Sequence, residues 1–441
     1  GGTILNLRER PLTQKVSYGN DPINNTIWGV DLNYQTESRF LTKMVDAIPL
    51  INTKEQSVIS VNAEFAHFLP GHSKAIGSSG TAYVDDFEGA KSTTDLKNYG
   101  TWFLASTPQG QPDLFPETDI STAFNFRTQI EYGKNRAKLA WYIIDPLFYD
   151  RNSSLVPPNV TKDELSKDAV RQVLETEVFP NKDIPSGTPT NIAVFNLAYY
   201  PSERGPYNYD ATPGPYSSGV NANGNLLDPD TRWAGVMRKI ESTDFEATNV
   251  EYIEFWLMDP FSEDTNNKGK LYFNLGDISE DVLRDSRKSY ENGLPTTTTV
   301  DNVDTTGWGR VPNIQALVES FDTEEGSREF QDVGYDGLRD SDERLFYSES
   351  GLHPFLDTLA SEFGPNSQAY QQAFIDPSAD NYHYFRGSDY DEDPTYSSVL
   401  ERYKRFNGPD GNSPTDAQNP ENYPTAATTL PDVEDLNRDN T

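Results

Sequence analysis

Residues 28–40, WGVDLNYQTESRF, alternate apolar and polar side chains over a longer run than most soluble strands do. The even positions are mainly apolar and the odd positions are polar or charged, so a strand here has one apolar face and one charged face. Residues 59–65, ISVNAEF, repeat the alternation after a connection that contains Pro49. Together the two runs predict an antiparallel hairpin.

Two interpretations fit a hairpin of this kind. Strands of about 9–11 residues with a two-residue period are the sequence signature of an outer-membrane β-barrel. Two half-buried strands of a soluble antiparallel sheet show the same alternation and are the commoner explanation when nothing else is known. The rest of the chain has to decide between them.

Composition limits the possible partners. The 441 residues carry a formal net charge of −33, and they include 24 Tyr, 23 Phe and 6 Trp, so the core must rest on aromatic side chains. The negative charge argues against nucleic acid or an anionic membrane surface as a partner, because both require clustered Lys and Arg. Divalent cations are the partners that the charge favours. The absence of cysteine excludes disulfides and thiol nucleophiles.

The fold class predicted for the whole chain is mainly β. Residues 1–72 form the barrel-type hairpin, and residues 82–292 form a jelly-roll-like antiparallel β-sandwich with an insertion over about residues 105–231. Residues 293–441 form an acidic, loop-rich region with short helices near residues 313–321, 354–363 and 397–406. The sandwich is predicted from short aromatic runs separated by Pro, Gly and Asn. We expect its core to contain Trp102, Trp141, Phe195, Phe255, Trp256, Leu271 and Phe273.

The sharpest local motif is DVGYDGLRDSDE at residues 332–343. Its acidic residues and Gly337 follow the spacing of a calcium-binding loop, except that Gly334 occupies the third position. Calcium takes about six to eight oxygen ligands, and the glycine allows the sharp turn that brings them together. The alternative is a solvated acidic turn. We expect a structural calcium site with the ligands Asp332, Asp336, Asp340 and Glu343.

A weaker calcium candidate lies at the end of the chain, at Asp435, Asn437 and Asp439. Catalytic groupings are scarce by comparison. The four histidines form no zinc-protease motif, and neither a nucleophile elbow nor a phosphate-binding glycine loop is present. A pair of glycosidase carboxylates is a spatial feature that 69 acidic residues neither support nor exclude. We expect no enzymatic activity.

Seven segments in the same order resemble the SprA family, also called Sov, the outer-membrane translocon of the type IX secretion system in gliding and secreting bacteria. The resemblance is carried by residues 57–71, 83–92, 136–149, 232–261, 271–283, 331–338 and 431–441. Family members are several times longer, so the resemblance implies that this chain is an internal section. That would agree with a start at Gly1 and an end within an acidic motif.

The resemblance implies a very large β-barrel that passes folded cargo proteins across the outer membrane, with a cell-surface cap, a PorV-like outer-membrane partner and a plug protein. Residues 26–68 would then be barrel strands in contact with outer-membrane lipid. Residues 83–430 would be an insertion on the extracellular face. A jelly-roll carbohydrate-binding module of the cell surface is the alternative, and a row of exposed aromatic side chains would favour it.

Overall fold

The computed structural model describes residues 1–9, 23–50, 52, 55–71, 94–119, 129–150, 152–154, 156–182, 184–242, 244–246, 250–259, 261, 269–314, 316–406 and 431–436. The chain divides into two compact units. We call residues 1–93, 178–188 and 244–254 the hairpin unit, and residues 94–177, 189–243 and 255–441 the main unit. Residues 83–92, which contribute to the family resemblance, lie outside the described residues.

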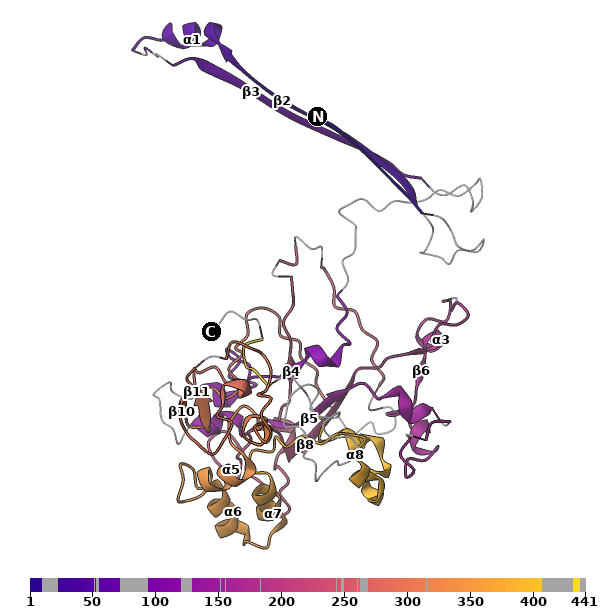
Figure 1. Cartoon of the computed structure of the whole chain (residues 1–441), viewed down its shortest axis with the longest axis vertical. Helices are drawn as coiled ribbons and strands as arrows, with labels where there is room; N and C mark the ends of the chain where they lie inside the picture. Colours follow the sequence, from indigo (N-terminus) through magenta and orange to yellow (C-terminus); the bar gives the residue numbers. More distant parts are fainter. Residues whose placement is uncertain are drawn as a thin grey trace. The chain divides into compact units, whose positions relative to one another are not determined.

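The hairpin unit contains a three-stranded antiparallel sheet in which β2 (Asn24–Ser38) lies between β1 (Gly2–Arg8) and β3 (Ser57–Leu69). Figure 1 shows β2 and β3 as a long, twisted ribbon. Residues directly opposite one another in an antiparallel pair point to the same face. The register pairs Leu32 with Ala63 and therefore gathers the apolar residues of both strands on one face. The predicted antiparallel hairpin is confirmed.

The apolar face of this sheet is open to solvent in the part of the chain that the structure describes. Val30, Leu32 and Phe65 are 49%, 55% and 56% exposed. The opposite face is polar in the middle of the two strands, where Asn33 lies across from Asn62, whereas Ile27 and Phe68 form an apolar pair on it near the end of β3. The two long strands are joined through α1 (Arg39–Asp46).

The main unit is built from short antiparallel sheets of two strands each. The pairs are β4 (Phe103–Leu104) with β9 (Val236–Met237), β5 (Ala137–Tyr142) with β8 (Asn196–Arg204), β6 (Val173–Leu174) with β7 (Asn191–Ile192), and β10 (Val303–Thr305) with β11 (Arg310–Pro312). The mainly β, antiparallel class is confirmed. Among the described residues these small sheets take the place of the two large packed sheets that a jelly roll would have.

The helices of the chain are short. Beyond α1 they are α3 (Glu175–Val178), α4 (Arg328–Gln331), α5 (Asp340–Phe346), α6 (Phe355–Phe363), α7 (Gln368–Ile375) and α8 (Val399–Tyr403). Single 3-10 turns occur at Tyr99–Thr101, Pro116–Asp119, Ile130–Gly133, Pro146–Tyr149, Glu164–Ser166, Pro229–Thr231, Glu291–Gly293, Ser388–Asp391 and Pro394–Ser397. The helices expected near residues 354–363 and 397–406 are present as α6 and α8, whereas the described part of 313–321 is not helical. No helix in the described ranges is both long and apolar enough to cross a membrane.

The core of the main unit is aromatic, as the composition predicts. Successive side chains of a strand point to opposite faces, so the side chains of β5 pack into two hydrophobic clusters, one on each face. Trp141 belongs to the larger cluster, while Tyr142 stacks on Tyr403 at 4.1 Å in the smaller one. Within the larger cluster, Tyr209 stacks on Tyr347 at a ring-centroid distance of 4.1 Å. The β5–β8 sheet therefore lies between the two clusters.

The predicted sandwich core is only partly correct. Trp141 is buried, and Trp102 and Phe195 are half-buried and stacked on each other at 5.9 Å. The prediction is wrong for four residues that are more than half exposed, namely Phe255, Trp256, Leu271 and Phe273. Their segments form no strand among the described residues. Both alternate positions of these segments are apolar, which is typical of a strand covered on both faces, but no described strand pairs with either segment.

Candidate metal centre

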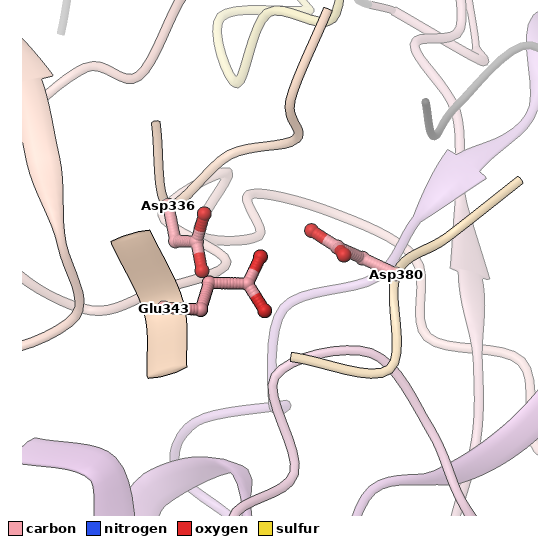
Figure 2. A group of neighbouring side chains, drawn as sticks. All are labelled: Asp336, Glu343 and Asp380. Carbon is pink, nitrogen blue, oxygen red and sulfur yellow. The ribbon is translucent and has the colours of Figure 1, made fainter. Parts of the chain in front are cut away.

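Three carboxylates from separate parts of the chain meet inside the main unit. Asp336 lies in the loop before α5, Glu343 lies on α5 itself, and Asp380 follows α7. One oxygen of each carboxylate lies within 4.8 Å of the other two, and all three residues are buried. Figure 2 shows Asp336 and Glu343 side by side, with the carboxylate of Asp380 facing them. We call these residues the buried triad.

The buried triad has fewer hydrogen bonds than its oxygens can accept. Asp336 accepts through Oδ1 from the Leu338 amide at 3.0 Å and through Oδ2 from the Ser378 hydroxyl at 2.6 Å. Glu343 accepts through Oε2 from the Ser378 amide at 3.1 Å. Oε1 of Glu343 and both oxygens of Asp380 accept no well-formed hydrogen bond from a described residue, although the Tyr207 hydroxyl lies near Asp380 and lowers the pKa of its carboxyl. Three buried carboxylate oxygens are therefore left for another ligand.

A second group of carboxylates shares Glu343. Asp340 and Asp376 each bring an oxygen within 4.8 Å of Glu343 and of one another, and both are half-buried. Asp340 accepts a hydrogen bond from the Asn381 amide group at 2.9 Å, whereas the buried Oδ1 of Asp376 has no partner among the described residues. Five acidic residues thus form one continuous cluster with Glu343 at its centre.

Burial and mutual repulsion oppose negative charge in this cluster. Burial, with smaller contributions from the neighbouring Asp340 and Asp376, raises the pKa of Asp336 to about 7, and the hydrogen bonds from Ser378 and Leu338 act against that rise. Burial is also the largest cause that raises the pKa values of Glu343 and Asp380, with Asp336 adding to both. No ion pair joins the triad to a described Lys or Arg. Its carboxylates are therefore stable together only if protons or a cation neutralise them.

The glycine that departs from the calcium-loop pattern has a structural reason. Gly334 has φ +85°, a backbone conformation that favours glycine. A Cβ atom at this position would lie 2.2 Å from Oδ2 of Asp380. Asp380 therefore occupies the space that a side chain in the third position of the loop would fill, and it brings a carboxylate there from a distant segment.

The structure assembles part of the predicted ligand set. Asp336, Asp340 and Glu343 join the cluster, whereas Asp332 lies outside both groups and forms an ion pair with Arg328 at 2.6 Å. Sequence reasoning missed Asp376 and Asp380, which lie in the segment DPSAD directly after α7. The misfit of Gly334 is the signal that could have indicated a ligand from elsewhere.

The weaker candidate near the end of the chain is only partly described. Asp435 forms a buried ion pair with Lys288, and Asn437 and Asp439 lie outside the described residues. The adjacent Glu434 is buried, and its carboxylate binds residues 431–436, which we call the terminal segment, to residues 282–289. Its Oε1 accepts from the amides of Val282 at 3.0 Å and Leu283 at 3.2 Å, and its Oε2 accepts from the Ser289 amide at 3.0 Å.

The carboxylate of Glu291 also binds the terminal segment. Its Oε2 accepts from the Asp432 amide at 2.7 Å, and its Oε1 accepts from the amides of Val333 at 2.9 Å and Gly334 at 2.8 Å. Burial raises the pKa of both Glu291 and Glu434, and their backbone hydrogen bonds act against that rise. Glu291 therefore links the terminal segment to the loop that carries Asp336.

Part of the chain matches a known protein family. Residues 354–441 match the SprA_N family model, which is described as motility related/secretion protein. The matched region begins just before α6 and includes Asp376 and Asp380 of the acidic cluster. The match confirms the predicted family resemblance. No curated protein matches the chain.

Proposed function

We propose that this chain is a non-enzymatic section of a channel that exports folded proteins across the outer membrane. The match of residues 354–441 to a family of motility- and secretion-related proteins supports a role in secretion. In this proposal the strands β2 and β3 belong to the wall of the channel. The main unit belongs to its extracellular cap. The observation that carries the proposal is the open apolar face of the β2–β3 sheet.

The arrangement of this face supports a lipid-facing role. Both long strands contribute to it, since Val30 pairs with Phe65 and Tyr34 pairs with Val61. These four side chains are each about half exposed. A continuous apolar face of this kind is unfavourable in water, whereas the outer face of a membrane barrel requires it. The polar face would then line the water-filled interior.

The edge of the sheet supports the same reading. β3 is an outer strand of the three-stranded sheet, and no described strand pairs with its free edge. A long strand with unpaired backbone groups invites pairing with a further strand, and closure into a barrel removes such edges. We expect β3 to continue into a larger sheet in the intact secretion protein.

The size of the main unit supports its assignment as a cap. Outer-membrane barrels carry long loops on the extracellular side and short turns on the periplasmic side, so a folded insertion of this length fits the cell surface. The resemblance supplies the proposed partners, which are a PorV-like protein, a plug protein and the folded cargo. We propose no chemical step for any of them.

A charge scan of the hairpin tests the proposal. Arginine on the lipid face of a barrel costs about 2–4 kcal/mol at the membrane midplane. Leu32→Arg should therefore reduce the amount of intact protein in the outer membrane and the secretion of cargo. Asn33→Arg is the matched control, because Asn33 is adjacent in sequence and points to the polar face. Equal effects of the two substitutions would contradict the proposed lipid contact.

A second candidate function, carbohydrate binding at the cell surface, is favoured by one observation. Phe255, Trp256, Tyr272 and Phe273 are all exposed, and Phe255 lies 5.5 Å from Phe273 between ring centroids. Exposed aromatic rings can stack on sugars. If this function is correct, the chain should bind surface polysaccharide in a calorimetric titration and Trp256→Ala should weaken that binding at least tenfold. Absence of binding would exclude it.

A further inference from the structure

We propose that the buried triad, Asp336, Glu343 and Asp380, binds a calcium ion, with Asp340 and Asp376 completing the acidic cluster around Glu343. This inference goes beyond the proposed function and does not depend on it. The site would connect the loop before α5, α5 itself and the segment that follows α7.

The buried triad has carboxylate oxygens that could accept more hydrogen bonds than they do. Asp380 is 2% exposed and Glu343 is fully buried, yet three of their four carboxylate oxygens accept no well-formed hydrogen bond from a described residue. Removing a carboxylate oxygen from water without a replacement is costly. All three residues turn their carboxylates toward the same point in Figure 2. A cation at that point would satisfy these oxygens together.

The carboxylate oxygens of the triad are close enough together to bind one calcium ion. Calcium binds oxygen ligands at about 2.3–2.6 Å, so two of its ligands are separated by at most about 5 Å. One oxygen from each residue of the triad lies within 4.8 Å of the other two, which agrees with this limit. The second group, centred on the same Glu343, meets the same limit. Glu343 can therefore contribute to a coordination shell drawn from both groups.

The third argument concerns the kind of metal. Every candidate ligand atom is a carboxylate oxygen, which calcium and magnesium prefer and which softer metals do not select. Magnesium releases its water molecules reluctantly and requires near-ideal octahedral geometry, whereas calcium tolerates an irregular shell of protein oxygens. Burial of the triad favours the ion that gives up its water more readily. Calcium fits these conditions best.

The fourth argument is that surrounding residues hold the triad in place. The Ser378 hydroxyl donates to Asp336, and the Ser378 amide donates to Glu343. The Tyr209 hydroxyl lies 2.9 Å from the same Ser378 hydroxyl. Gly334 leaves space for Asp380, as described above. Asp336 and Glu343 are thus positioned by hydrogen bonds of their own, and their carboxylate oxygens keep further lone pairs that can bind the proposed ion.

The experiment uses the whole 441-residue chain at pH 7.5. We would measure calcium binding by calorimetry, terbium luminescence excited through nearby tyrosines such as Tyr209, and thermal unfolding in calcium, in magnesium and in chelator. One calcium should bind per chain and displace terbium. Calcium at about a hundredfold over its Kd should raise the Tm by roughly 5 °C relative to chelator. Magnesium should give a smaller rise.

Two variants test the ligand assignment. Asp380→Asn should weaken calcium binding at least tenfold, because it removes the negative charge of one of the three buried carboxylates. Asp332→Asn should leave the Kd within twofold, because Asp332 pairs with Arg328 outside the cluster. Identical unfolding of the wild type in calcium and in chelator, without stoichiometric binding, would overturn the proposal even if a variant failed to fold. An equal response to magnesium would overturn the assignment of calcium.

Discussion

Removal of the Glu434 carboxylate should weaken the attachment of residues 431–436 to the rest of the main unit. Glu434→Ala leaves three buried amides, those of Val282, Leu283 and Ser289, without an acceptor. An unsatisfied buried donor costs about 1–3 kcal/mol, so the free energy of unfolding should fall by at least about 3 kcal/mol. In a unit of this size that corresponds to a Tm lowered by roughly 6 °C.

The assay combines denaturant unfolding with hydrogen exchange of the three amides. Glu434→Gln keeps an oxygen for Val282 and Leu283 but places an amide group opposite Ser289, so its loss should be about a third as large. Glu362→Ala is the matched control, since Glu362 is an exposed residue on α6 and should change stability by less than about 0.5 kcal/mol. Glu434→Ala with wild-type stability and full protection of the three amides would refute the reasoning.

Two further predictions concern the main unit. Burial and the neighbouring Asp281 raise the pKa of Asp285 to about 6, so its charge destabilises the native state above that pH and the penalty disappears as pH falls toward 3.8. Asp285→Asn should therefore increase the free energy of unfolding by up to about 3 kcal/mol at pH 8 and by little at pH 4, measured by urea unfolding, and a pH-independent difference would contradict the prediction. Gly334→Ala should displace Asp380 and lower the Tm, because its Cβ would lie 2.2 Å from a carboxylate oxygen, whereas Gly326→Ala, at the same φ of +85° but with open space around it, should cause only backbone strain. Equal losses in these two glycine variants, measured by thermal unfolding, would show that the contact with Asp380 has no effect.

The hairpin could be predicted because the alternation that specifies each strand lies within one short stretch of sequence. A two-residue period fixes which side chains share a face, and the register of β2 and β3 follows from aligning the apolar residues. Residues 161–164, TKDE, match the capping box that begins a helix, and the structure shows how a distant partner overrides this local motif. The Thr161 hydroxyl accepts from the Glu164 amide at 3.2 Å, but the Glu164 carboxylate accepts from the Val399 amide at 2.9 Å. Only the 3-10 turn Glu164–Ser166 forms there.

The acidic cluster was only partly predictable, because its ligands come from segments far apart in sequence. The spacing of the 332–343 loop identified Asp336, Asp340 and Glu343, and it could not indicate that Asp376 and Asp380 join them while Asp332 pairs with Arg328 outside the cluster. The segments around Trp256 and Phe273 illustrate the same limit. Their apolar patterns predict coverage on both faces but cannot say which part of a protein supplies it.

The most direct test of the account is cysteine labelling of the hairpin in the intact secretion protein. This chain has no cysteine, so single substitutions at residues 30, 31, 32 and 33 can each be labelled without background from it. The account predicts that positions 30 and 32 react with a lipid-soluble maleimide and resist a membrane-impermeant one, while positions 31 and 33 react with the impermeant reagent. Uniform reaction of all four positions with the impermeant reagent would contradict a lipid-facing β2.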